Sequence, residues 1–138
     1  MLGLCLGLAG TLWAQVPTDN FTLTWNHSIE KIRWEEDYNV TLQGLVLVEA
    51  RVKGTGAGME IPDDAYFKDG NWHYQPKLPT LPILRLGRTP EAGDFELCFT
   101  QISGDIQCKA MSHWIGPPNK HIAAVEVWGC DNQAMTIE

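Results

Sequence analysis

The alternation of apolar and polar side chains is the feature that most limits how this chain can fold. The apolar Phe21, Leu23 and Trp25 alternate with polar residues, which predicts a first strand over 21–27. A period of two is that of a β-strand with one buried face. No ten-residue stretch of the sequence shows a convincing amphipathic helical pattern. The pattern therefore predicts an all-β protein.

Turn residues divide the rest of the chain into further strands. Gln43-Gly44, Asp69-Gly70 and Ser103-Gly104-Asp105 each lie between apolar runs and predict hairpins. Strands are also expected at 83–86, 95–102, 106–110 and 123–128. With about eight short strands and no repeat or linker, we expect a single-domain antiparallel β-sandwich or open barrel.

Length and charge narrow the classes of function. The chain has 138 residues, 44% of them hydrophobic, which is enough for one domain with a real core. Its formal net charge is −7, and the ten Lys and Arg residues are spread singly. Without a basic stripe, we expect neither nucleic-acid binding nor attachment to an anionic membrane surface.

The first fourteen residues resemble an export signal. Residues 1–13 carry no charged side chain, and leucine recurs through them before the small residue Ala14. We expect cleavage after Ala14, which leaves 15–138 as one β domain in the periplasm or secreted, with no membrane insertion afterwards. The positively charged start of a typical signal is missing, which indicates either a true start further upstream or an atypical leader. An uncleaved apolar strand or a membrane-anchored tail is the alternative.

Three cysteines follow this segment. Cys98 and Cys108 flank a predicted hairpin, and Cys130 lies on the last predicted strand. A Cys98–Cys108 disulfide, or a bond from either residue to Cys130, is expected in an oxidising compartment, and one of the three thiols then stays unpaired. The spacing does not match a zinc knuckle, so we expect no metal site.

An ordered set of motifs carries a family resemblance. It consists of residues 21–31, which include His27-Ser28-Ile29-Glu30, then Trp34-Glu35-Glu36, 45–51 and Gly56-Ala57-Gly58-Met59. The set resembles the bacterial domain of unknown function family 1850, over about residues 21–74 most closely. The resemblance implies a small exported protein that is often encoded beside tripartite periplasmic transporters, and so a transporter component as partner.

Polar residues of these motifs form a candidate binding site. Glu49 lies on a strand expected to pair with the strand of Glu35 and Glu36, and glycine N–H groups can hold an anion or a partner's carbonyls. The candidate residues are His27, Ser28, Glu30, Glu35, Glu49, Gly56 and Gly58. The alternative is local: His27 and Ser28 bond a turn, and Glu30 pairs with Lys31 or Arg33 at the surface.

Catalysis is not expected. His27 and Ser28 are adjacent, so on a strand they point to opposite faces and cannot easily share a hydrogen bond. No Gly-x-Ser-x-Gly elbow is present, and the histidines are scattered. A divalent ion at Glu35, Glu36 and Asp37 would be unspecific, and no cofactor motif occurs.

For four of the six tryptophans, the position in the strand pattern indicates whether the side chain is buried. Trp25 and Trp128 lie on predicted strands and are expected in the core, whereas Trp72 and Trp114 lie near turns and are candidates for an exposed contact surface. We expect an exported accessory or protein-interaction module without enzymatic activity. The alternative is a periplasmic protein that binds a small ligand or a metal.

Overall fold

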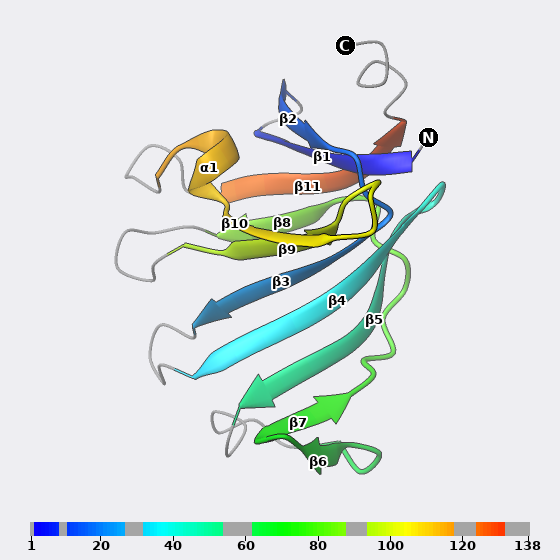
Figure 1. Cartoon of the computed structure of the whole chain (residues 1–138). Helices are drawn as coiled ribbons and strands as arrows, with labels where there is room; N and C mark the ends of the chain where they lie inside the picture. The colour runs from blue at the N-terminus through cyan, green and yellow to red at the C-terminus, as the bar shows by residue number, and fades with distance from the viewer. Residues whose placement is uncertain are drawn as a thin grey trace.

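The computed structural model describes residues 2–8, 11–26, 32–53, 62–87, 94–117 and 124–131. These residues form eleven strands and one short helix (Figure 1). The elements are β1 (Leu2–Leu8), β2 (Thr11–Val16), β3 (Asn20–Asn26), β4 (Arg33–Thr41), β5 (Gly44–Lys53), β6 (Tyr66–Lys68), β7 (Asn71–Tyr74), β8 (Leu84–Gly87), β9 (Glu96–Thr100), β10 (Ile106–Ala110), α1 (Ser112–Ile115) and β11 (Ala124–Asp131).

The strands form two antiparallel sheets. The smaller sheet has the order β2-β1-β11-β8, and the larger has the order β10-β9-β3-β4-β5-β7-β6. In Figure 1 the larger sheet fans from β9 and β10 down to β6 and β7, with the strands of the smaller sheet near the top. The all-β, sandwich-like prediction is confirmed. Among the described residues, no helix is long and apolar enough to cross a membrane.

The core lies between the two sheets. Leu23, Leu45 and Leu97 from the larger sheet and Leu4 and Val127 from the smaller sheet are fully buried and belong to one cluster. Each such side chain contributes about 1.5–3 kcal/mol by leaving water. In β3 the apolar residues of the predicted alternation face this cluster, so the intervening threonines lie on the opposite face of the sheet.

The predicted hairpins form as expected. β4 and β5 join through Leu42-Gln43, and β6 and β7 join through Asp69-Gly70. Gly44 opens β5 with φ 137°, and a Cβ atom there would lie 2.4 Å from the Leu81 carbonyl oxygen. That close approach allows Leu45 and Leu81 to exchange two backbone hydrogen bonds, which fasten the proline-rich segment to the sheet.

The N-terminal segment is part of the folded domain in this structure. β1 pairs with β11 on one side and with β2 on the other, and Leu4 and Leu6 are completely buried. The structure therefore has two strands, β1 and β2, where the sequence predicts a leader. Removal of residues 1–14 stays a prediction, and it would take away β1 and four of the six residues of β2.

All four cysteines are paired. Cys98 and Cys108 form the predicted disulfide across β9 and β10. Cys130 bonds to Cys5, so the expectation that one thiol stays unpaired is wrong. That expectation counted only the cysteines after the leader, whereas β1 lies beside β11 and brings Cys5 to Cys130.

The burial of three tryptophans agrees only in part with the prediction. Trp25 is partly buried against the core cluster, as expected, although it is not fully enclosed. Trp114 also packs on that cluster, so it is less exposed than its position near a turn suggested. Trp72 is half-buried and contacts Phe67 edge-on.

Candidate functional site

The candidate site lies on the face of the larger sheet that points away from the core. Two of the predicted residues, Glu35 and Glu49, are described there on neighbouring strands β4 and β5. The structure brings their carboxylates to one guanidinium group, that of Arg51. The other predicted residues, His27, Ser28, Glu30, Gly56 and Gly58, lie outside the described residues.

Arg51 is the centre of the cluster. Its Nη1 and Nη2 donate to Asp37 Oδ2 and Oδ1 at 2.7 and 2.8 Å, which is a bidentate pair. Its Nε donates to Glu35 Oε1 at 3.0 Å, and Nη1 also donates to Glu49 Oε2 at 2.7 Å. Only 16% of the Arg51 side chain is exposed. The guanidinium is thus fixed by three carboxylates.

The strand register explains this convergence. Glu35 is directly opposite Arg51, and Asp37 is directly opposite Glu49. The register shifts between Asp37 and Tyr38, because β5 carries an extra residue at Val48. This bulge keeps both Leu47 and Ala50 in the buried face while Glu49 and Arg51 point outward.

Two of the carboxylates around Arg51, those of Asp37 and Glu49, have lowered pKa values. Partial burial alone raises the pKa of Asp37, but hydrogen bonds from Arg51 and Thr22 outweigh burial and lower that pKa below its ordinary value. Burial likewise raises the pKa of Glu49, and the bonds from Arg51, His73 and Tyr66 reverse the effect and lower it. Hydrogen bonds to Asp37 raise the pKa of Arg51.

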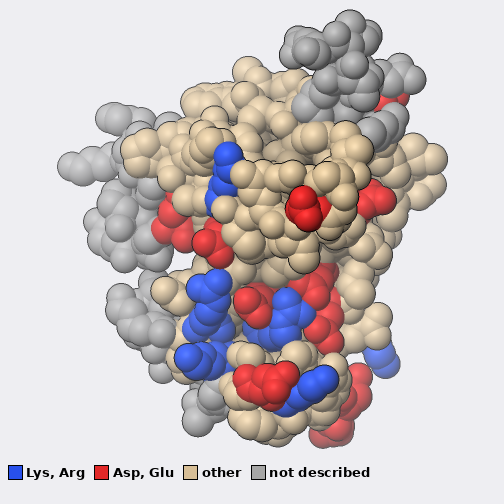
Figure 2. Space-filling model, in the orientation of Figure 1, with Lys and Arg blue, Asp and Glu red and all other residues tan. Residues whose placement is uncertain are grey.

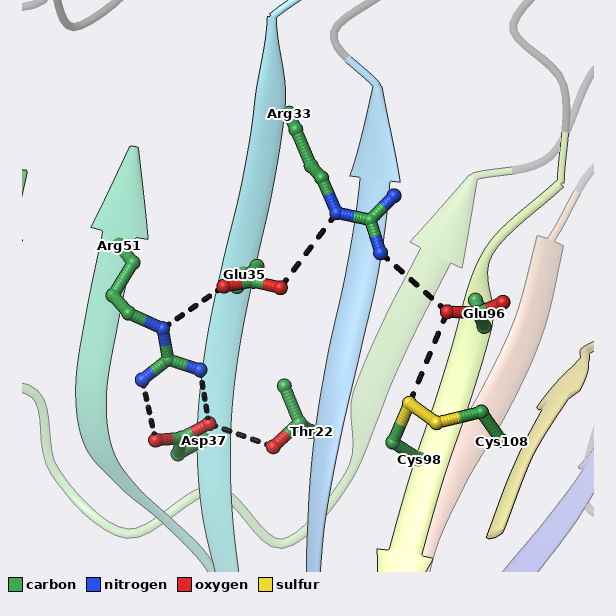
Figure 3. Close-up of a disulfide and its surroundings, with 8 residues drawn as sticks. All are labelled: Thr22, Arg33, Glu35, Asp37, Arg51, Glu96, Cys98 and Cys108. Carbon is green, nitrogen blue, oxygen red and sulfur yellow. Dashed lines mark hydrogen bonds and ion pairs between the residues drawn. A yellow bond between two sulfur atoms is a disulfide. The ribbon is translucent and has the colours of Figure 1, made fainter. Parts of the chain in front are cut away.

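The cluster extends across the sheet in both directions, and Figure 3 shows the part that runs towards β9. Towards β9, Arg33 lies 3.6 Å from Glu35 and 3.5 Å from Glu96. Towards β6, the Tyr66 hydroxyl donates to Glu49 at 3.2 Å, and His73 Nδ1 lies 3.5 Å from the same carboxylate. We call this set the outer-face network; its members are Thr22, Arg33, Glu35, Asp37, Glu49, Arg51, Tyr66, His73 and Glu96.

Acidic groups dominate the outer-face network. It contains two guanidinium groups and four carboxylates, so acidic groups exceed basic ones by two. Figure 2 shows charged side chains gathered over the lower half of the view, where Figure 1 places β4, β5, β6 and β7. The network is thus an accessible, organised surface with a negative bias.

Glu36 lies on the other face and has a different environment. It accepts a hydrogen bond of 2.9 Å from the Tyr38 hydroxyl. Burial raises the pKa of Glu36, and the weaker opposing effect of the Tyr38 hydrogen bond does not cancel it. Since Glu35 and Asp37 point outward, the run of three acidic residues does not converge on one ion.

A separate hollow opens at one edge of the sandwich. Its volume is about 390 Å³, and it lies between the end of β2, the β9–β10 hairpin and α1. The lining includes Gln15, Gln101, Gln107, Phe99 and Trp114, and no lining residue is charged. Amides and aromatic rings suit an uncharged ligand that forms hydrogen bonds.

Sequence reasoning missed most of the outer-face network. It selected Glu35 and Glu49 but not Asp37, Arg51 or His73. The register that the β4–β5 turn sets would place Arg51 opposite Trp34, on the other face of the sheet from Glu35. The bulge in β5 shifts that register and carries no plain sequence signal.

A protein-family model described as a domain of unknown function, DUF1850, matches residues 21–106. The match runs from β3 to the first residue of β10 and includes the outer-face network. No curated protein and no solved structure matches the chain. Because the matched segment spans more than half of the chain, the protein belongs to the DUF1850 family.

Proposed function

We propose that this protein is an exported accessory module that binds another protein through the outer face of its larger sheet. The partner is a component of a tripartite periplasmic transporter. The observation that carries the proposal is the Arg51 cluster, in which one largely buried guanidinium binds three carboxylates on an accessible sheet face. The partner class rests on the family resemblance alone.

Preorganisation favours a binding role for this face. A flexible surface carboxylate loses side-chain entropy when it binds, whereas Asp37 and Glu49 are already fixed by Arg51. Tyr66, half of whose surface is exposed, lies at the end of the outer-face network and stacks on His73. Tyrosine and arginine are enriched where protein interfaces derive most of their binding energy.

The charge of the face indicates the chemistry of the partner. The excess of carboxylates in the outer-face network favours a partner surface that carries Lys or Arg side chains. Charge complementarity of this kind speeds association and weakens with added salt. Binding should therefore fall as the ionic strength rises.

Two disulfides support export. Cys5–Cys130 and Cys98–Cys108 account for every cysteine of the chain. Disulfides form and persist in oxidising compartments and are rare in the cytosol. The cysteine pairing thus fits a protein that works in the periplasm or outside the cell.

A pull-down with matched variants tests the proposal. Tagged protein is incubated with periplasmic and membrane extracts, and retained transporter subunits are quantified by mass spectrometry. Glu35→Gln with Glu49→Gln should reduce their retention at least tenfold. The control is Glu126→Gln, which changes a carboxylate on the smaller sheet. Unchanged retention by the double variant, or no transporter subunit retained by the parent, contradicts the proposal.

A second candidate function is supported by the hollow beside Trp114. Its uncharged lining favours a neutral small ligand rather than an ion. Native mass spectrometry of the purified protein tests it. A bound molecule that is lost in Trp114→Ala would favour ligand binding over the protein-interaction role, and an unliganded mass would count against it.

A further inference from the structure

The Cys98–Cys108 disulfide is placed where a second thiol can reach it. The two residues are directly opposite each other on β9 and β10. β10 is an edge strand of the larger sheet. Cys108 is exposed, and Cys98 is half-buried. In the other disulfide, Cys5 is 2% exposed and Cys130 is half-buried, so neither residue is as exposed as Cys108. Because thiol–disulfide exchange needs access to a sulfur atom, a dithiol should open Cys98–Cys108 first.

The hairpin does not depend on this bond for its shape. Five residue pairs of the β9–β10 ladder, from Ile106 opposite Thr100 to Ala110 opposite Glu96, hold the two strands together. β9 is anchored further by its pairing with β3. After reduction, the two thiols should therefore remain opposite each other on the same face of the sheet.

A carboxylate completes the group. Glu96 lies two residues before Cys98 on the same face, and its Oε1 is 3.8 Å from Cys98 Sγ (Figure 3). Neither sulfur of the disulfide carries a proton, so this distance is only a close contact. One ligand atom from each of Glu96, Cys98 and Cys108 lies within 4.8 Å of the others.

In the disulfide the two sulfur atoms are bonded to each other, so the spacing that a tetrahedral metal ion needs can arise only after reduction. Ligands around zinc, with Zn–S bonds near 2.3 Å, lie about 3.8 Å apart. Small rotations of the side chains would bring two thiolates and one carboxylate to that spacing, and water would take the fourth position. Arg33 Nη2 lies 3.5 Å from the same oxygen, Glu96 Oε1, so a metal ion would bind the other oxygen, Oε2, or share Oε1 with Arg33.

We infer that Cys98, Cys108 and Glu96 form a redox-gated metal site, closed in the disulfide and open to Zn²⁺ after reduction. In the opening step, a dithiol delivers two electrons and two protons; the Cys98–Cys108 bond breaks, and the dithiol becomes a disulfide. Zinc then displaces the thiol protons, since the thiolate is the metal ligand.

Selective reduction is the first test. The full chain is treated with limiting dithiothreitol, free thiols are alkylated, and labelled peptides are identified by mass spectrometry. Label should appear on Cys98 and Cys108 at least about tenfold faster than on Cys5 and Cys130. Equal labelling rates for the two disulfides, or earlier labelling of Cys5, would contradict the selective opening of Cys98–Cys108.

Zinc titration is the second test. The protein is reduced with a phosphine, which does not compete as a thiol, and titrated with Zn²⁺ against a chromogenic chelator. One equivalent should bind to the reduced protein and none to the oxidised one. Glu96→Gln should raise the Kd at least about tenfold, whereas Glu126→Gln should leave it unchanged.

A serine variant controls for the remaining cysteines. Cys98→Ser with Cys108→Ser keeps Cys5–Cys130, and circular dichroism checks its fold. This variant should bind no zinc after the same reduction. If it binds as tightly as the reduced parent, or if the reduced parent binds no zinc, the metal site is disproved.

Discussion

The guanidinium of Arg51 donates two hydrogen bonds, of 2.7 and 2.8 Å, to the carboxylate of Asp37 across the β4–β5 hairpin. Arginine and carboxylate match in this geometry because both groups are planar and forked. The pair ties two central strands of the larger sheet and organises the outer-face network around it.

Replacement of Arg51 should destabilise the fold measurably. Arg51→Met keeps much of the stem but leaves Glu35, Asp37 and Glu49 close together without their shared counter-charge. We expect the free energy of unfolding to fall by about 2 kcal/mol, measured by urea denaturation. The control, Arg85→Met, removes an arginine that is 70% exposed and should change it by less than about 0.5 kcal/mol. Equal effects would contradict the central role of Arg51.

Asp37 should contribute to stability at neutral pH and lose that contribution in acid. Its pKa in the folded state lies below the ordinary 3.8. The contribution is therefore complete above 3.8 and disappears as the pH falls through the folded pKa. In urea denaturation at a series of pH values, Asp37→Asn should have a lower free energy of unfolding than the parent at pH 7. This difference should become smaller below pH 3.8. A difference that widens in acid would refute this account.

The ionisation of Glu36 should lower the stability of the fold as the pH rises, which is the opposite of the effect of Asp37. Burial raises its folded pKa above the ordinary 4.5, so the folded state holds a proton that the unfolded state releases. Stability should then decline as the pH rises from 4.5 through the folded pKa. Glu36→Gln cannot ionise and can still accept the Tyr38 hydrogen bond, so its decline over that range should be smaller. Identical pH profiles for the two proteins would count against burial of Glu36.

The Cys5–Cys130 disulfide should be a major source of stability when the N-terminal strand is retained. It joins residues 125 positions apart, and closing so long a loop restricts the unfolded chain strongly. Cys5→Ala with Cys130→Ala should lower the free energy of unfolding by about 3–5 kcal/mol.

A chain that begins at Gln15 provides the comparison. It lacks β1 with the buried Leu4 and Leu6, and should unfold at a lower urea concentration than the full chain. Equal midpoints for the two chains would mean that the strand adds nothing. The intact mass of the protein isolated from the periplasm shows whether cleavage after Ala14 occurs.

Strands with one buried face were predictable, whereas a strand buried on both faces was not. β3 alternates and was found within one residue at each end. β1 is buried at Gly3, Leu4, Cys5, Leu6 and Gly7, because it lies inside the smaller sheet and both of its faces are covered. Such a strand reads as a continuous apolar run, which is also the signature of an export signal.

Pairings between side chains were predictable only where the two residues are close in sequence. Cys98 and Cys108 flank one short hairpin, so their pairing follows from the turn between them. Arg51 meets Asp37 from another strand after a bulge, and hydrophobic pattern does not encode that shift. Contacts of this kind depend on tertiary register.

The most direct test of the proposed function is photo-crosslinking from a single surface position in the periplasm. A photoreactive residue is placed at Lys53, which is exposed on β5, or at Arg85, which is exposed on the smaller sheet. The account predicts a crosslink to a tripartite transporter component from position 53 and none from position 85. A crosslink to that component from position 85 alone, or from neither position, would contradict it.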